Sequence, residues 1–339
     1  MTFFRSNSFT CGGLFAGIGG FCSGFESAGF TSIWASDSDE RVAQTYLHNF
    51  PGTHFVLKDI LKLDASSLPE VDVLHAGFPC QSFSAAGNRM GFNDPRGRLF
   101  DTMLDLIENM PIRPKVLLFE NATNLLSGDG GAWFDHVKRR IKKAGYWFND
   151  ANALRISSHD HFGLPQKRER LFMIATNRDI FDFNPFTYLP EKCVPKGLLN
   201  YIREETVNDP KYYLASDNRY GEWLLREGGD MAQNQLIQLR QHIVRKQEPD
   251  ICPTLTANMG GGGHNVPFLM DRGKLRKLTE RECLNLQGFP REFSFPEELP
   301  SSSKYKQIGN SVCPLVSEWL AKQIITFFRE EAGNDQMAI

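Results

Sequence analysis

Residues 10–37 have the sequence TCGGLFAGIGGFCSGFESAGFTSIWASD, which predicts a strand, a glycine-rich turn, a helix and a second strand. The apolar segment Thr10–Leu14 is the first strand, and Gly29 is a plausible end for the amphipathic helix after the turn. Thr31–Ser36 is the second strand, and Asp37 follows it directly. Strand, helix and strand in this order are typical of a parallel sheet covered by helices.

The same alternation continues to about residue 176. Further strands are predicted at Val71–His75, Val116–Glu120 and Arg170–Thr176. Helices are predicted at Val42–Phe50, Leu99–Met110 and Trp133–Ala144. The sequence therefore predicts an α/β fold, with a parallel sheet and helices on both of its faces.

The composition changes near Asn177. From there to about residue 272 the periodicity is poor, polar residues are frequent, and Gly260–Gly263 is a run of glycines. We interpret 177–272 as a small second domain of irregular structure. The glycines alone are also compatible with a plain flexible linker.

Two helices are predicted after this region, at Thr279–Gln287 and at Leu315–Glu331, with Pro314 in the first turn of the second. We expect the C-terminal helix to return to the first domain. That domain is then discontinuous and comprises residues 1–176 plus 273–339.

Composition excludes several classes of protein. The chain has 339 residues, 41% of them hydrophobic and 23% charged, which is enough apolar material for a core and excludes long disorder. A formal net charge of −2 weakens, without excluding, a nucleic-acid partner, because a basic groove can lie within a neutral total. No apolar run has the roughly 18 residues of a membrane helix, and Met1–Phe9 does not resemble a secretory signal.

The seven cysteines are scattered and include no C-x-x-C pair, so zinc and redox sites are poor interpretations and no metal is predicted. Free thiols without a signal predict a reducing, cytoplasmic location. Cys11, Cys22, Cys283 and Cys313 lie in segments that suit small buried hydrophobic residues.

The glycine-rich turn is the first candidate binding site. Asp37 stands about 20 residues after Gly17, which is the spacing at which a carboxylate receives ribose hydroxyls in nucleotide-binding α/β folds. The turn departs from G-x-G-x-x-G and no Lys-Ser/Thr follows it, which favours a nucleoside cofactor over NAD or ATP. A tight turn with a solvated aspartate is an equally good interpretation.

Two further side chains are expected at the same edge of the sheet. Asp59 falls where a third strand would end and could accept an adenine amino hydrogen, although on its own it is better explained as a plain surface aspartate. Cys80 follows a predicted strand and stands after Pro79 in a loop rich in Pro, Gly and Ser, which makes it a candidate nucleophile. The usual alternative, a buried hydrophobic thiol, does not suit that loop.

Glu120 follows a buried strand, so partial burial is expected to raise its pKa and let it donate a proton. If Arg170 begins a strand, Arg168 and Arg170 point to the same side and form a site for a phosphate or a carbonyl oxygen. The alternative for Glu120 is a glutamate at a helix N-terminus. The alternative for Arg168 and Arg170 is a solvated run of charges.

Taken together, these segments resemble the DNA cytosine-5 methyltransferase family in its compact bacterial or phage form. The segments that carry the resemblance are Phe15–Gly20, Asp37, Asp59-Ile60, Pro79–Gln81, Glu120-Asn121, Gln166–Arg170 and Gln307–Val312. A weaker local match lies at Pro253–Thr256.

The resemblance implies a Rossmann-like S-adenosylmethionine-dependent methyltransferase domain and a target-recognition domain at 177–272. The cofactor-binding residues that it implies are Phe15, Gly17, Ile18, Gly19, Asp37, Asp59, Ile60, Pro79, Leu99, Asn310 and Val312. The family often has glutamate where Asp37 stands and an aromatic residue where Ser38 stands, which puts adenine stacking at Ser38 in doubt. Ala122 after Glu120-Asn121 is a milder change from the family's valine.

For catalysis, the resemblance implies that Cys80 adds to C6 of a flipped-out cytosine, so that C5 can attack the methyl donor. Glu120 would hold the N3/N4 edge of the base, Arg170 would contact its carbonyl and Arg168 would help to orient the site. The implied DNA contacts are Ser84, Arg96, Arg240, Gln241, Thr254 and Leu255.

The family also implies a monomer that acts on double-stranded DNA, often beside a restriction endonuclease. The nearest alternative is a tRNA cytosine-5 methyltransferase, which shares the motifs. An inactive DNA-binding protein on this scaffold and a thiol-dependent hydrolase are more distant alternatives.

Overall fold

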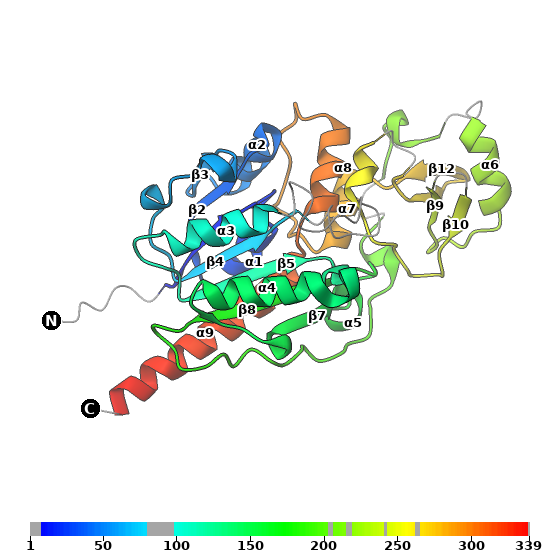
Figure 1. Cartoon of the computed structure of the whole chain (residues 1–339). Coiled ribbons are helices and arrows are strands. Elements are labelled where there is room, and N and C mark those ends of the chain that lie inside the picture. The colour runs from blue at the N-terminus through cyan, green and yellow to red at the C-terminus, as the bar shows by residue number, and fades with distance from the viewer. Residues whose placement is uncertain are drawn as a thin grey trace. The chain divides into compact units, whose positions relative to one another are not determined.

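The computed structural model describes residues 8–79, 98–202, 206–214, 219–240, 243–261 and 265–337, without the side chains of 219, 220, 240 and 334–337 (Figure 1). The chain divides into two compact units. Unit 1 comprises Met1–Ile156, Glu169–Pro190 and Pro314–Ile339, and unit 2 comprises Ser157–Arg168 and Glu191–Cys313. The boundaries of these units differ from those of the two functional domains that the sequence predicts. The division into functional domains stays a prediction.

Unit 1 is built on a sheet with the strand order β3-β2-β1-β4-β5-β8-β6, in which β7 also pairs with β8. The strands are β1 (Thr10–Leu14), β2 (Thr31–Asp37), β3 (His54–Leu57), β4 (Val73–Gly77), β5 (Val116–Asn121), β6 (Tyr146–Trp147), β7 (Ala153–Ser157) and β8 (Glu169–Asn177). The predicted Rossmann-like α/β class is confirmed. Strands β1 to β5 are parallel, whereas β8 is antiparallel to β5. The sequence missed this reversal because an apolar run indicates burial and not strand direction.

The helices of unit 1 are α1 (Gly20–Ala28), α2 (Glu40–Asn49), α3 (Arg98–Glu108), α4 (Ala132–Lys143) and α9 (Pro314–Met337). As predicted, Gly29 ends α1 in the left-handed conformation, with φ 105°. Helix α9 packs on α1. A Cβ on Gly24 would lie 2.4 Å from the Pro314 carbonyl oxygen, so glycine is needed for this close approach. The C-terminal helix thus returns to unit 1.

The residues of β4 alternate between the two faces of the sheet. Leu74 and Ala76 belong to the apolar cluster that contains Phe100 of α3. His75 instead stacks on Phe21 of α1, with ring centroids 4.8 Å apart. Helices therefore cover both faces of the sheet, with α3 and α1 on opposite sides (Figure 1).

Unit 2 contains α5 (Ser158–Phe162), α6 (Arg219–Gly228), α7 (Glu280–Gln287), α8 (Ser301–Asn310) and an antiparallel sheet with the order β10-β9-β11-β12. Its strands are β9 (Ile237–Arg240), β10 (Ile243–Lys246), β11 (Phe268–Asp271) and β12 (Lys274–Lys277). This region is more regular than the sequence predicts. Each strand has four residues, which is too short for an alternating pattern to be recognised.

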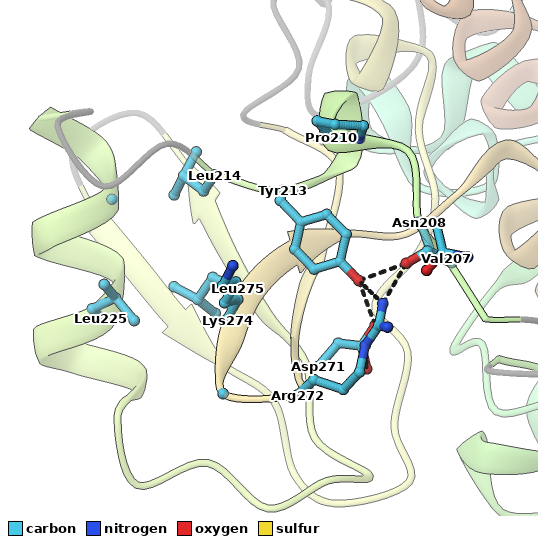
Figure 2. A pocket seen from close by; sticks show the side chains of 12 residues that line it. Val207, Asn208, Pro210, Tyr213, Leu214, Leu225, Asp271, Arg272, Lys274 and Leu275 are labelled. Carbon is cyan, nitrogen blue, oxygen red and sulfur yellow. Dashed lines mark hydrogen bonds and ion pairs between the residues drawn. The ribbon is translucent and has the colours of Figure 1, made fainter.

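A buried ion pair fixes β12 to α7. The guanidinium of Arg276, fully buried, donates two hydrogen bonds of 2.8 Å to Glu282 and one of 2.9 Å to Asp271. A short network of polar contacts extends outward from Asp271 to the hydroxyl of Tyr213, 2.9 Å away (Figure 2).

None of the helices in the described part of the chain combines the length and the apolar character of a membrane span.

Candidate active site

The turn between β1 and α1 is shaped by left-handed backbone conformations. Phe15, Gly17 and Gly19 have φ values of 50°, 55° and 86°. The carboxylate of Asp37 fastens this turn, because it accepts hydrogen bonds from the backbone N–H of Gly17 (3.0 Å) and of Asp39 (3.1 Å). Burial raises the pKa of Asp37, and these backbone hydrogen bonds oppose that rise.

The turn has open space beside Gly17, where an added Cβ meets no atom within 4 Å. Ile60 belongs to a buried apolar cluster, and the partly buried side chains of Phe15 and Leu99 pack against that cluster. An open turn, a carboxylate and apolar groups suit a nucleoside, whose ribose hydroxyls need acceptors and whose base needs an apolar surface.

The second predicted carboxylate, Asp59, is exposed and accepts a hydrogen bond of 3.0 Å from the N–H of Leu61. Strands β2 and β3 end together, because Asp37 is in register with Leu57. Asp37 is the last residue of β2, and Asp59 lies two residues beyond the end of β3, so both lie at the ends of neighbouring strands.

Glu120 lies at the end of β5, with 8% of its surface exposed. Its carboxylate pairs with the guanidinium of Arg170, at a distance of 3.1 Å between Oε1 and Nε. Across the sheet, Glu120 is in register with Gly77 of β4 and Phe172 of β8.

Cys80, Ser84, Arg96 and Gln241 lie outside the described residues. The structure does describe the chain up to Pro79, which is half-buried. The side-chain amide of Asn121, fully buried, donates a hydrogen bond of 3.1 Å to the carbonyl of Phe78. The end of β5 therefore holds the residues that lead to Cys80.

Asn121→Ala is expected to lower both stability and catalysis. The variant leaves the buried carbonyl of Phe78 without this partner, at a cost of about 1–3 kcal/mol. If Cys80 is the nucleophile that the sequence predicts, its displacement should lower the rate of the reaction about tenfold or more. Urea unfolding and a single-turnover assay measure the two effects. Asn109→Ala removes an exposed bond to the Asp105 carbonyl and serves as control. An unchanged reaction rate in Asn121→Ala would contradict this role.

The two arginines predicted to act together make different contacts. Arg170 belongs to β8 and pairs with Glu120. Arg168 precedes the strand and donates to backbone carbonyls of unit 2, at Leu255 (3.0 Å) and Ser311 (2.7 Å).

Ile18, between Gly17 and Gly19 in unit 1, is fully buried, and the other predicted residues that the structure describes belong to unit 2. Leu255 is fully buried, whereas Thr254 is half-buried and its hydroxyl donates to the Lys167 carbonyl. Arg240 ends β9, and only its backbone is described. Asn310, exposed, ends α8, and Val312 follows it with 8% of its surface exposed.

A cavity of about 810 Å³ lies elsewhere in unit 2, beside the β11–β12 hairpin. Figure 2 shows the hydroxyl of Tyr213 within this cavity's lining, bonded to Asp271, Arg272 and the Val207 carbonyl. None of the predicted site residues that the structure describes is among the residues that line it. Its size alone therefore does not identify the reaction site.

Asn121 and Gln166 lie within the sequence motifs, but the motifs alone predict no role for either residue. Both are fully buried polar residues with bonded side-chain amides. Only the residue type could have indicated a structural role in the sequence. An amide side chain both donates and accepts hydrogen bonds, so it can hold a neighbouring active-site residue in place.

Comparisons with known proteins identify the family to which the motifs of this site belong. The family model for C-5 cytosine-specific DNA methylases matches residues 9–326. The Type II methyltransferase M.Bsp6I of Bacillus sp. (strain RFL6) is 37% identical over 92% of this chain and 96% of that protein. The Type II methyltransferase M.NgoBI of Neisseria gonorrhoeae is 35% identical, over 90% of this chain and 89% of that protein.

Among solved structures, a mutant of DNMT2 from Spodoptera frugiperda is similar, with a TM-score of 0.70 over 94% of this chain and 100% of that one. At 21% identity this likeness concerns the fold alone. The family match spans most of the sequence, and this chain belongs to the C-5 cytosine-specific DNA methylase family.

Proposed function

We propose that this protein methylates C5 of one cytosine within a short double-stranded DNA sequence, through a covalent bond between Cys80 and C6 of the base. Enzymes of this family take S-adenosylmethionine as the methyl donor. The observation that carries the proposal is the pairing of Glu120 with Arg170 at 3.1 Å, beside the strand end that leads to Cys80.

The residues around the glycine-rich turn fit S-adenosylmethionine, which supplies an electrophilic methyl group when bound. Asp37 would accept hydrogen bonds from the ribose hydroxyls, and Asp59 would accept one from the adenine amino group. Phe15, Ile60 and Leu99 would give the base an apolar surface. The turn Gly17-Ile18-Gly19, together with Pro79, Asn310 and Val312, completes the proposed set.

The chain's own groups would make C5 reactive. C5 of cytosine is a poor nucleophile, and addition of the Cys80 thiolate to C6 turns it into an enamine carbon. Glu120 would hold the N3/N4 edge of the base, and Arg170 would orient Glu120 and contact the base carbonyl. After transfer, a base removes the C5 proton, the C6–S bond breaks, and the thiolate leaves.

The cytosine must leave the helix to reach these groups, which costs a few kcal/mol. We propose that residues 177–272 recognise the target sequence, with Arg240, Gln241, Thr254 and Leu255 as contacts. Arginine suits guanine, and glutamine suits adenine. Ser84 and Arg96 would contact phosphates, so binding should weaken steeply with salt.

We also propose that the protein is a cytoplasmic monomer and the modification enzyme of a restriction–modification system. Two relatives that match it over about nine-tenths of its length are named Type II methyltransferases, which supports this role.

Bisulfite sequencing tests the proposed function. The chain is expressed in cells that lack DNA methylation, and their genome is converted and sequenced. Protection of cytosines within one short motif is the expected result, and it reveals the recognition sequence. A genome without protected cytosines, together with soluble protein that methylates tRNA, would instead support the RNA alternative.

Asp37→Asn tests the cofactor site. The amide would place an N–H against one of the two N–H donors that the carboxylate now accepts, and the charge is lost. Affinity for S-adenosylhomocysteine should fall about 10- to 100-fold, corresponding to about 1.5–3 kcal/mol. Asp64→Asn is the control, because Asp64 accepts an N–H from Ser66 at an exposed site. An equal loss in both variants would contradict the role of Asp37.

The same site predicts a pH dependence. The ionised carboxylate of Asp37 is the form that accepts hydrogen bonds. Because burial raises its pKa, protonation on acidification begins at a higher pH than for an ordinary aspartate. Affinity for S-adenosylhomocysteine should therefore decrease as the pH falls through that raised pKa, and this part of the decrease should be absent in Asp37→Asn.

A further inference from the structure

Arg168 links two segments of unit 2 that are far apart in the sequence. Only 4% of its surface is exposed. Its guanidinium donates to the carbonyls of Leu255 (3.0 Å) and Ser311 (2.7 Å), with a longer contact of 3.4 Å to the Gly309 carbonyl. Its own carbonyl accepts a hydrogen bond of 2.9 Å from the Ser158 N–H, which fixes the base of the side chain.

Gln166 and Gln287 form a second link between the same two segments. The side-chain oxygen of Gln166 accepts from the Leu255 N–H at 3.0 Å, and its nitrogen donates to the side chain of Gln287 at 2.7 Å. Gln287 in turn donates to the Ser311 carbonyl at 2.8 Å. Both glutamines are fully buried. Two independent paths therefore run from Leu255 to Ser311.

The backbones of the two segments are also in direct contact. Gly309, in α8, packs against the backbone of Thr256 and Ala257, and a Cβ on Gly309 would lie 2.1 Å from the Thr256 carbonyl carbon. A displacement of one segment is therefore resisted by the other.

These segments carry residues with different proposed partners. Thr254 precedes Leu255 and is a proposed DNA contact, whereas Asn310 and Val312 flank Ser311 and are proposed cofactor contacts. We propose that Arg168 is a positioning residue that couples the binding of target DNA to the binding of S-adenosylmethionine. Leu255 takes part through its backbone, because its N–H and carbonyl are both bonded and its side chain is buried. This inference rests on the function proposed above.

The chemistry of the side chain explains why arginine stands at this position. A guanidinium presents several N–H donors in a rigid plane, so it can hold two carbonyls at a fixed separation. The ammonium of lysine is a single compact centre on a flexible stem. Arg168→Lys should therefore keep the charge and lose the simultaneous contact with Leu255 and Ser311.

The test measures coupling rather than activity. The affinity of S-adenosylhomocysteine is determined by calorimetry for the whole protein, with and without a saturating duplex that carries the motif found by bisulfite sequencing. For the wild type we expect the duplex to change this affinity by at least about fivefold. In Arg168→Lys the ratio of the affinities with and without DNA should fall to within about twofold of one.

Two further variants keep the test decisive. Gln287→Met removes one of the two paths with little change in volume, and it should lower the coupling partly even where Arg168→Lys does not fold. Arg281→Lys is the matched control, because Arg281 also donates to backbone carbonyls in unit 2, at Arg291 (2.8 Å) and Phe293 (3.0 Å). Neither carbonyl belongs to the two linked segments, so the coupling should persist.

The outcomes separate this inference from the proposed function. A wild-type protein that methylates DNA but shows no coupling overturns the inference alone, and so does full coupling in Arg168→Lys and Gln287→Met. A wild-type protein that methylates no DNA overturns the proposed function. Equal loss in Arg281→Lys would show that Arg168 is only structural.

Discussion

Cys80→Ala is expected to abolish methyl transfer while leaving the fold and the binding of S-adenosylhomocysteine intact. Without the thiolate nothing adds to C6, and C5 of cytosine remains too weak a nucleophile to attack a methyl sulfonium. The transfer rate should fall by at least about 10⁴-fold, as for other nucleophiles that act covalently. Tritiated methyl transfer to a duplex that carries the recognition motif measures the effect.

Covalent trapping makes this prediction specific. A duplex with 5-fluorocytosine at the target position lacks the C5 proton that must be removed, so the adduct cannot resolve. The wild type should form a complex that survives denaturing electrophoresis, and Cys80→Ala should form none. Cys193→Ala is the control, because Cys193 is a free cysteine with an exposed side chain. Trapping of Cys80→Ala, or its loss in Cys193→Ala, would contradict the assignment.

The parts of the fold that sequence could predict are those with a strong local signal. The first strand, the helix and its end at Gly29 agree with β1 and α1, because glycine at a left-handed position is a local requirement. The antiparallel direction of β8 has no such signal, since it depends on where the preceding chain returns to the sheet. The strands of unit 2 were missed because each is only four residues long.

The sequence likewise predicts some features of the candidate site and misses others. The rule that ligands gather at the carboxyl ends of parallel strands placed Asp37 and Glu120 at strand ends, where the structure has them. Pairing of Glu120 with Arg170 joins residues that are far apart in the sequence, and only the register of β5 and β8 brings them together. The burial of Arg168 could not be foreseen, because a charged run is more often solvated.

Arg140 illustrates the same limit. Arg140 lies in a run of basic residues in α4, a pattern that usually indicates a solvated surface, yet most of its side chain is buried. Its guanidinium pairs with Asp101 (2.9 Å), Asp105 (2.6 Å) and Glu108 (3.0 Å) of α3, and only 12% of the side chain is exposed. The acidic partners lie more than thirty positions earlier, so helical spacing within α4 carries no trace of them.

Glu120→Gln is expected to lower the transfer rate about 10²- to 10⁴-fold, which is the usual contribution of a positioned acid–base group. The amide keeps the shape of the side chain, but it cannot carry the charge that favours protonation of the base at N3. The ion pair with Arg170 is also lost, and that guanidinium would then be half-buried without its carboxylate. Affinity for S-adenosylhomocysteine should not change, because neither residue belongs to the proposed cofactor set.

A double-mutant cycle with Arg170→Lys separates the two effects. If Arg170 acts by orienting Glu120, the two substitutions together should slow transfer little more than Glu120→Gln alone, since contacting residues are not additive. Glu169→Gln is the matched control, because Glu169 pairs at 2.7 Å with Arg155, and both side chains are well exposed. Such surface pairs contribute about 0–1 kcal/mol, so transfer should persist. Fully additive losses in the cycle would mean that Arg170 acts on the base independently of Glu120.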